Sequence, residues 1–389
     1  ANADKLEELL RESVRLRLMS DVPFGAFLSG GIDSSTIVAL MSQFLDEPVK
    51  TFSVGFKGDG EEFSELPYAR LVAEQYQTDH HEVIIGPKDF IDCFEKVAWH
   101  LDQPIADEAG VANYMVAKLA SRHVKMVLTG EGGDELFAGY ARYAGERLSP
   151  VFKRIPSPIR SLALGVSNHL PGLRRPKIAL YALCQSDEAT RFANWFPFFS
   201  REMKADLLSN ELKEELNGSS AVHVFAEHLA RTDGTDPLSR MLYVDTKLHL
   251  PDDLLARGDK LSMAVSVEAR VPFLDHKLVE FAASLPPHLK LRRLTRKYLL
   301  KKVSRIWLPP KIIERKKQGF PVPISVWFRK EVRPFVRDIL SPAAIKRRGL
   351  FNPEYVEQLL NEHEAGLDNH GSFLFGLLSV ELWHRLFID

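Results

Sequence analysis

Two short stretches of this sequence place carboxylates directly after glycine turns. Residues 28–35 read LSGGIDSS, and residues 129–134 read TGEGGD. Glycine allows a tight turn and the close approach of a ligand, while a serine or acidic side chain can begin a helix. The free backbone N–H groups at such a helix start would face an anion. The first stretch has neither the lysine of a Walker loop nor the spacing of a dinucleotide fingerprint.

The acidic residues of the two turns, Asp33 and Asp134, suit a magnesium ion. Mg²⁺ takes hard oxygen ligands, commonly one or two carboxylates together with polyphosphate oxygens. Each aspartate taken alone could equally be a helix cap. The repeated design therefore predicts a nucleotide phosphate site, provided that the fold brings both turns to one place.

Strand-like and helix-like patterns alternate around these turns. The strand-like runs are residues 24–28, 51–56, 81–85 and 124–130, and helical patterns lie at 37–45, 68–76, 90–101 and 114–119. This alternation is typical of an α/β fold with a doubly wound parallel sheet, whose ligands bind at the carboxyl ends of the strands. Both turns follow such ends.

The alternation stops near residue 150, where amphipathic segments with aromatic clusters follow. We therefore expect two parts, a nucleotide-binding α/β subdomain over residues 1–150 and a mainly helical part over 151–389. The helical part is expected to complete the site.

The composition excludes several classes of function. The 389 residues are 45% hydrophobic, enough to bury a large core, and the net charge of -1 argues against a nucleic-acid partner such as duplex DNA. Only Cys93 and Cys184 are present, which fits a reducing cytoplasm and offers no zinc spacing, while one disulfide between them stays open. No apolar stretch approaches the roughly 20 residues of a membrane span. We expect a cytoplasmic protein with no membrane partner.

Two charged segments in the second half allow several interpretations. Residues 250–281 contain many charged side chains interspersed with valine and phenylalanine. These charged residues could form a structural ion network, line a cleft or be a solvated face. Residues 292–302, RRLTRKYLLKK, could bind nucleic acid, form a basic helix face or be part of an ATP cleft. Only Tyr298 could stack there on a base, which disfavours RNA.

Taken in order, five motifs resemble the synthetase domain of asparagine synthetase, within the ATP pyrophosphatase (PP-loop) superfamily. They are FLSGGIDSS, TFSVGF, TGEGGDELFAGY, LPDDLLARGDKLSMAVSVEARVPFLD and IIERKKQGFPVPISVWF. The resemblance covers roughly residues 5 to 387. It implies the PP-loop fold, ATP and Mg²⁺ as cofactors, and a pyrophosphate cradle in the first turn.

The resemblance also implies roles for individual residues. The pyrophosphate loop would comprise Ser29, Gly30, Gly31, Asp33, Ser34 and Ser35, with Asp33 and Asp134 as magnesium ligands. The adenosine would be surrounded by Leu28, Val54, Thr129 and Gly130. Glu131 matches the acid of the amidation step, and Lys317 matches the lysine at the α-phosphate, with Lys316 as a one-residue alternative.

The implied reaction converts aspartate, ATP and ammonia to asparagine, AMP and pyrophosphate through a β-aspartyl adenylate. Family members that use glutamine carry an N-terminal glutaminase domain with a nucleophilic cysteine as first residue, and the sequence has no such domain before its synthetase part. We therefore expect free ammonia as the nitrogen source, unless a glutaminase domain or subunit supplies it.

Two other functions remain open at this point. A ligase of the same fold could amidate or cyclise another carboxylate, as relatives that make amidated sugars, peptide macrolactams or β-lactams do. A non-catalytic nucleotide-binding module would be expected to lack one of the four residues Asp33, Glu131, Asp134 and Lys317, and all four are present.

Overall fold

The protein is described by a computed structural model covering residues 1–168, 174–195, 199–317 and 322–389. The chain forms two compact units that alternate along the sequence. The first, here called the sheet unit, comprises Ala1–Leu101, Asp107–Tyr140 and Leu248–Pro323. The second, the helical unit, comprises Asp102–Ala106, Ala141–Lys247 and Ile324–Asp389. The predicted two-part division placed a single boundary at 150, whereas here residues 248–323 return to the sheet unit.

The sheet unit contains five parallel strands in the order β3-β2-β1-β4-β5. The α/β, doubly wound parallel fold is thereby confirmed. The strands are β1 (Phe24–Phe27), β2 (Lys50–Phe56), β3 (Asp79–Ile85), β4 (Met126–Leu128) and β5 (Glu268–Arg270). The first four lie within the predicted runs or extend them by one or two residues.

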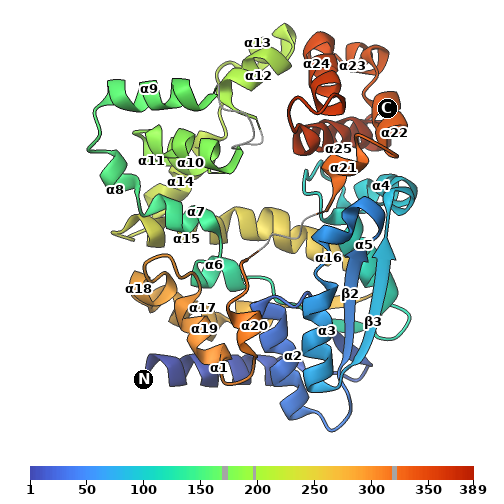
Figure 1. Ribbon diagram of the computed structural model, residues 1–389, viewed down its shortest axis with the longest axis vertical. Helices are drawn as coiled ribbons and strands as arrows, with labels where there is room; N and C mark the ends of the chain where they lie inside the picture. Colours follow the sequence, from blue (N-terminus) through green and yellow to red (C-terminus); the bar gives the residue numbers. More distant parts are fainter. Residues whose placement is uncertain (169–173, 196–198, 318–321) are drawn as a thin grey trace. The chain divides into compact units, whose positions relative to one another are not determined.

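Helices cover both faces of this sheet. On one face α2 packs on β1 and α3 on β2, and α1 packs on α2, α17 and α19. On the other face α5 packs on β2 and β3, while α16 packs on β5, α4 and α5 (Figure 1). These helices are α1 (Asn2–Arg17), α2 (Ile32–Phe44), α3 (Leu66–Tyr76), α4 (Pro87–Leu101), α5 (Gly110–Ala120), α16 (Ala256–Met263), α17 (His276–Ser284) and α19 (Tyr298–Ser304).

Shorter elements complete the sheet unit. They are η1 (Gly58–Phe63), α6 (Gly133–Phe137), the π-helical turn η2 (Leu250–Leu255), η3 (Pro272–Leu274), α18 (Pro287–Lys290) and α20 (Pro310–Ile313). The main core lies between β1, β4 and the helices of the first face. All residues of α2 from Asp33 to Met41 are buried, so protein surrounds this helix except at its C-terminal end, where Gln43 and Phe44 are exposed.

The fifth strand was not predicted. It consists of Glu268, Ala269 and Arg270, which carry no apolar run, and it pairs with β4 in the register Met126↔Glu268 and Leu128↔Arg270. Backbone hydrogen bonds give this pairing its stability irrespective of the side chains, which explains why the pattern of apolar residues did not reveal it.

The described part of the helical unit contains no strand beyond the isolated bridge between Leu208 and Phe351. This confirms the mainly helical character of the second half. Its helices are α7 (Ala141–Glu146), α8 (Ser149–Phe152), α9 (Ser157–Asn168), α10 (Arg174–Cys184), α11 (Glu188–Ala193), α12 (Arg201–Leu207), α13 (Asn210–Leu216), α14 (Val222–Arg231), α15 (Pro237–Lys247), α21 (Ile324–Trp327), α22 (Arg333–Ile339), α23 (Pro342–Arg348), α24 (Pro353–Glu364) and α25 (Gly371–Phe387).

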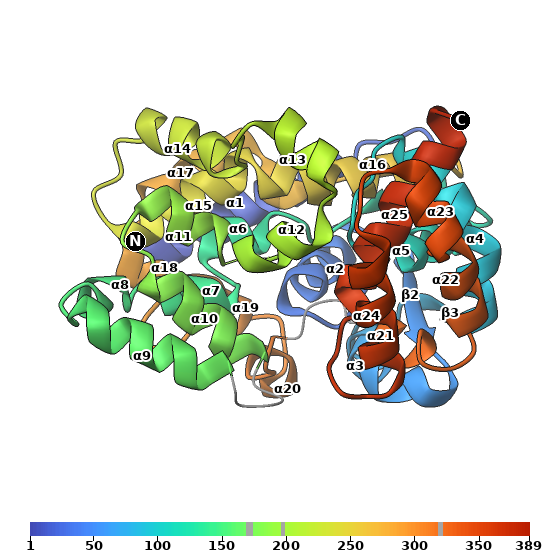
Figure 2. The same ribbon diagram turned by 90° about the horizontal axis from the view of Figure 1, so that it is seen from above.

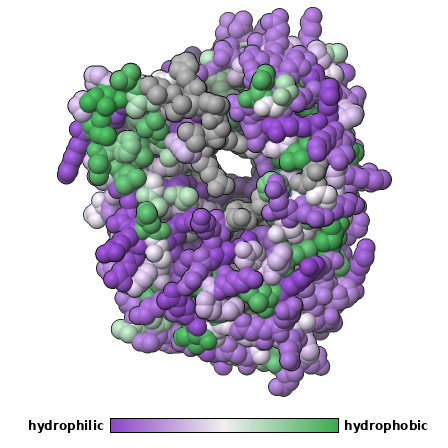
Figure 3. Space-filling model, in the orientation of Figure 1, coloured by the Kyte–Doolittle hydropathy of each residue, from purple (hydrophilic) through white to green (hydrophobic). Residues whose placement is uncertain are grey.

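The C-terminal helices of this unit form a group around α25. Helix α25 packs on α21, α22 and α24, as Figure 2 shows in the red part of the chain. Elsewhere in the unit, apolar side chains of α8 and α9 reach the surface, and apolar residues gather in this region of Figure 3. The exposed ones include Val151, Ile159 and Leu162.

The structure also bears on the two cysteines and on the question of a membrane span. Cys93 and Cys184 are both free thiols. Within the described ranges, every helix is too short or too polar to cross a membrane.

We predict that Gly25→Ala destabilises the sheet unit. Gly25 lies in β1 between two neighbouring strands, where an added Cβ would lie 2.4 Å from the carbonyl oxygen of Lys50 and 2.9 Å from the ring of Phe52. Overpacking of this kind costs about 1–3 kcal/mol. Urea unfolding monitored by circular dichroism measures the change.

The matched control is Gly165→Ala in α9, where an added Cβ meets nothing within 4 Å. This change should leave stability unaltered or raise it by up to about 1 kcal/mol, because alanine favours the helix. Equal stability of the Gly25 variant and the wild type would contradict the packing described for β1.

Candidate active site

The strand order brings the two glycine turns to one place. Strands β1 and β4 are neighbours, paired through Gly25↔Val127 and Ala26↔Leu128. The chain leaves β1 toward β2 and β3 on one side, and continues from β4 to β5 on the other. Ligands of doubly wound sheets bind outside the carboxyl ends of the strands at such a change of direction. Residues 29–35 and 129–134 follow these two ends.

The first turn is held by its serines. The Ser34 hydroxyl accepts a hydrogen bond from the backbone N–H of Ser29 (3.3 Å) and donates one to the carbonyl of Gly31 (3.3 Å). Gly30 adopts a left-handed conformation with φ 68°, and an added Cβ there would lie 2.5 Å from Tyr68. Helix α2 begins directly after this turn, so its first N–H groups are oriented toward a ligand above the sheet.

Glycines also allow the second turn to lie directly against the first. A Cβ on Gly130 would lie 2.8 Å from the backbone nitrogen of Ser34, and one on Gly133 would lie 2.6 Å from Oδ1 of Asp33. Gly132 has φ 87°, which other residues rarely adopt. The two turns therefore form one continuous surface, and any side chain at Gly130 or Gly133 would separate them.

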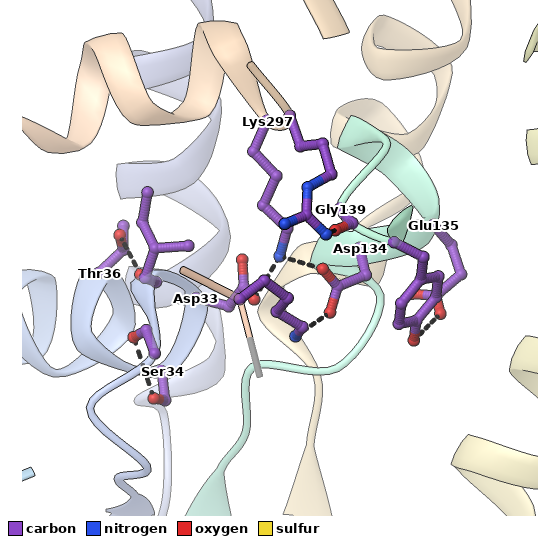
Figure 4. A network of polar contacts seen from close by, with 12 residues as sticks. Asp33, Ser34, Thr36, Asp134, Glu135, Gly139 and Lys297 are labelled. Carbon is purple, nitrogen blue, oxygen red and sulfur yellow. Dashed lines mark hydrogen bonds and ion pairs between the residues drawn. The ribbon is translucent and has the colours of Figure 1, made fainter. Parts of the chain in front are cut away.

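A buried lysine joins the two aspartates. The Nζ atom of Lys297 lies 2.5 Å from Oδ2 of Asp33 and 2.6 Å from Oδ1 of Asp134 (Figure 4). Lys317 reaches the other oxygen of Asp134, with Nζ 2.5 Å from Oδ2. Lys297 is 3% exposed, and both aspartates are 8% exposed. This is a cluster of two carboxylates and two ammonium groups, in which Asp33, Asp134 and Lys297 are buried and Lys317 enters from the exposed side.

The buried charges shift one another's pKa values. Burial opposes ionisation of Asp134, but Lys297 and Lys317 outweigh it and hold the pKa of Asp134 below its usual range. Burial likewise opposes the charge of Lys317, and the carboxylates of Asp134 and Asp33 outweigh it and raise the pKa of Lys317. Burial raises the pKa of Asp33 against the effect of Lys297. Lys317 thus remains cationic at neutral pH, as a site for polyphosphate requires.

Lys297 was not singled out from the sequence. It lies within the basic segment 292–302, for which part of an ATP cleft was one of three interpretations. Its backbone has φ 53°, and its N–H donates to the carbonyl of Phe137 at 3.1 Å, which fixes the start of α19 beside α6. The only sequence signal was the place of this lysine directly before a helix. That signal is weak, because its partners Asp33 and Asp134 lie more than 150 residues away in the sequence.

Glu131 lies in the second turn, three residues before Asp134. Thr129 donates from Oγ1 to Oε2 of Glu131 at 2.5 Å. Burial raises the pKa of Glu131, while the hydrogen bond from Thr129 and the charge of Arg257 oppose the rise. A Cβ on Gly258 of α16 would lie 3.4 Å from Oε1, so the start of α16 passes close to this carboxyl group. A carboxyl group of raised pKa can accept a proton near neutral pH.

The charge-dense segment 250–281 divides into separate contacts. Arg257, which is 5% exposed, pairs with Asp107 at 2.5 Å. Burial and the neighbouring Asp107 raise the pKa of Asp253 to about 6. Further along, Asp275 pairs with Arg17 at 3.0 Å and accepts a hydrogen bond from the first turn of α17. The first part of the segment thus lies near Glu131, and the last part is a structural anchor for α1.

The remaining candidate residues differ in their burial and in their contacts. Ser35, Leu28, Val54 and Thr129 are buried near the ends of β1, β2 and β4. Ser29 and Gly31 belong to the hydrogen-bonded first turn. Lys316 and Lys317 are both exposed residues, and Lys317 contacts Asp134. Residues 318–321 of the late motif lie outside the described residues.

We predict that Lys297→Met lowers stability at neutral pH by about 3–5 kcal/mol, because it leaves buried carboxylates without their shared cation. The loss should shrink as the pH falls toward 4, since the freed carboxylates then gain protons in the folded state. Thermal unfolding from pH 4 to 8 measures both effects. Lys302→Met is the control, because Lys302 is an exposed residue of α19, and its change should be within about 0.5 kcal/mol. A pH-independent loss would contradict the buried ion cluster.

Comparison with known proteins places these features in a family. The family model described as asparagine synthase matches residues 5–385. The chain is 35% identical over 385 residues to "Asparagine synthetase [glutamine-hydrolyzing] 1" of Bacillus subtilis, covering 99% of this chain and 59% of that protein. It is 34% identical over 390 residues to "Putative asparagine synthetase [glutamine-hydrolyzing]" of Mycobacterium tuberculosis, covering 100% of this chain and 58% of that protein.

A more distant relative carries a different name. "Amidase chyE" of Penicillium rubens is 28% identical over 366 residues, covering 82% of this chain and 52% of that protein. The chain thus spans somewhat more than half the length of the curated relatives it matches. The family model, in contrast, extends over nearly all of the chain, through both glycine turns and both lysines of the ion cluster. The chain belongs to the asparagine synthase family.

Proposed function

We propose that this protein is an ATP-dependent amide ligase that forms asparagine from aspartate and ammonia and releases AMP and pyrophosphate. The observation that carries the proposal is the meeting of two glycine turns, Asp33, Asp134, Lys297 and Lys317 at the carboxyl ends of β1 and β4. In a member of the asparagine synthase family, this is the arrangement expected for the phosphates of ATP.

In the proposed reaction, an oxygen of the substrate's β-carboxylate attacks the α-phosphorus, and pyrophosphate leaves with the electrons of the broken P–O bond. Ammonia then attacks the acyl carbon, AMP leaves, and the nitrogen loses a proton. The first turn and the start of α2 would hold the leaving phosphates. Lys297 and Lys317 would neutralise the charge that develops on phosphate oxygens, the main assistance that phosphoryl transfer needs.

Other residues would bind the nucleoside and handle the proton. Leu28, Val54, Thr129 and Gly130 offer buried apolar side chains and backbone groups suited to a purine. Glu131 is the proposed base for the ammonium proton, because its pKa is raised and it lies in the same turn as Asp134.

A magnesium ion fits the aspartate pair. Asp33 and Asp134 both contact one nitrogen atom, so their oxygens converge, and Oδ1 of Asp33 lacks a hydrogen-bond partner within the described residues. No group of three or more histidine, cysteine or acidic residues suited to a metal occurs in the described part of the chain. Two protein carboxylates suit Mg²⁺, which commonly takes its other ligands from phosphates and water. When bound, it would neutralise phosphate charge.

The nitrogen donor and the location are also part of the proposal. The relatives' names describe glutamine hydrolysis, and the chain spans 58–59% of their length. We propose that ammonia is the nitrogen nucleophile at this site, with glutamine as its source where a glutaminase domain or subunit is joined to it. The substrates are small molecules, and we propose that the protein acts in the cytoplasm.

A second candidate is amidation of another carboxylate by the same chemistry. A relative named an amidase matches 82% of the chain, so members of this group do not share one name. The adenylate step would be the same, and only the acceptor would differ.

The proposal predicts aspartate-dependent exchange of labelled pyrophosphate into ATP. The assay uses a panel containing aspartate, glutamate, a sugar acid and a peptide carboxylate, and ammonium is then added to follow amide formation. Aspartate should support exchange, and AMP and pyrophosphate should be the products. Exchange with another member of the panel alone would favour the second candidate, and ADP with phosphate as products would exclude an adenylate.

We predict that Glu131→Gln separates the two half-reactions. Glutamine keeps the size of the side chain but cannot accept a proton from the attacking ammonia, so amide formation should fall about 100-fold or more while exchange persists. Both assays are run on one preparation of the variant. Asp33→Asn is the comparison, because it should reduce both activities together. Equal proportional losses in Glu131→Gln would remove this residue from the amidation step.

A further inference from the structure

Arg315 contacts three residues beside the phosphate site, which are Gly30, Glu65 and Tyr68. Its Nη1 donates to the carbonyl of Gly30 at 3.3 Å, and its Nη2 forms an ion pair with Glu65. Its guanidinium also lies over the ring of Tyr68, 4.0 Å from the centroid. The side chain is 8% exposed. An arginine with these three contacts has a nearly fixed position.

Two of the residues that Arg315 contacts, Glu65 and Tyr68, lie at the start of α3, which packs against the first glycine turn. Glu65 precedes α3 and Tyr68 lies in its first turn. Gly30 packs so closely on the backbone of Tyr68 that an added Cβ would lie 2.5 Å away. The start of α3 and the pyrophosphate turn are therefore in direct contact, and Arg315 binds both.

Arg315 also lies on the short segment that carries Lys317. The preceding helix α20 is anchored by Ile312 and Ile313, which are 2% and 1% exposed. Two residues after Arg315, Lys317 reaches Asp134 in the second turn. The tripeptide 315–317 thus contacts the first turn at one end and the second turn at the other, while Lys316 between them is exposed.

We propose that Arg315 is a positioning residue that holds Lys317 at the phosphate site by fixing its segment to the Gly30 turn and the start of α3; the catalytic part of this inference rests on the proposed function. Arginine suits this role because one planar guanidinium can stack on a ring and donate to two acceptors at once. A lysine retains the charge but cannot make all three contacts. The charge alone is therefore insufficient.

A double-mutant cycle tests the inference. Arg315→Lys should lower the exchange kcat about 10- to 100-fold, with a smaller change in KM for ATP, because a displaced Lys317 loses contact chiefly with the transition state. In a Lys317→Ala background, Arg315→Lys should have less than about a twofold effect. If the fold-losses in exchange kcat of the two single variants multiply in the double variant, the inference is overturned, because Arg315 then acts independently of Lys317.

A spectroscopic measurement makes the test independent of activity. Reductive ¹³C-methylation labels the lysines for NMR, and Lys317→Arg assigns the Lys317 signal. In the wild type, Nζ of Lys317 lies 2.5 Å from Oδ2 of Asp134, so the Lys317 methyl signal should move toward the chemical shift of the exposed lysines in Arg315→Lys as this contact loosens. An unchanged Lys317 chemical shift would overturn the inference. Absence of exchange in the wild type would instead refute the proposed function, and the NMR result would still decide the positioning role.

Variants of the partners keep the test usable if Arg315→Lys folds poorly. Tyr68→Leu removes the stacked ring and should reproduce the fall in exchange and the change in the Lys317 signal, whereas Tyr68→Phe keeps the ring and should not. Arg70→Gln is the matched control, because Arg70 lies on the same helix and its side chain forms an ion pair with Glu82 of β3, 2.7 Å between Nη2 and Oε2. A Tyr68→Leu variant that behaves like Tyr68→Phe would also contradict the inference.

Discussion

Two carboxylates buried side by side need a cation, and this requirement governs the arrangement of the sheet unit. Asp33 and Asp134 each follow a central strand, and neither could remain ionised at 8% exposure without compensation. Lys297 supplies it from a segment far along the chain, at 2.5 and 2.6 Å from the two carboxylates. The return of residues 248–323 to the sheet unit therefore completes its electrostatics as well as its last strand.

The same cluster prepares the site for a highly charged ligand. Its ammonium groups and helix N-terminus are fixed before any phosphate arrives, so little reorganisation is needed when charge moves during a reaction. The carboxylates that hold the lysines are also the candidate ligands of a metal ion. The lysines of this cluster could therefore exchange contacts with the aspartates for contacts with phosphate oxygens, while the aspartates bind the metal ion that accompanies the phosphates.

Much of the fold could be predicted from the sequence because its early part follows a regular pattern. Four apolar runs alternating with helical periodicity gave β1 to β4, and glycines marked where the turns are. The strand Glu268–Arg270 could not be found in this way, because it is short, charged and stabilised through its backbone. The site divides similarly. Asp33, Asp134 and Lys317 were found by motif, whereas Lys297 depends on a contact between residues 264 positions apart, which local spacing does not encode.

The interrupted course of the sheet unit along the chain affects how the protein can fold during synthesis. Strand β4 pairs with β5 across more than 130 intervening residues, and Lys297 meets its partners later still. Such long-range contacts give a high contact order, because loop-closure entropy must be overcome before the pairing stabilises the chain. A nascent chain that has passed β4 still has an open sheet edge and two uncompensated aspartates. The folding of this unit therefore cannot be completed before the ribosome has translated β5 and Lys297.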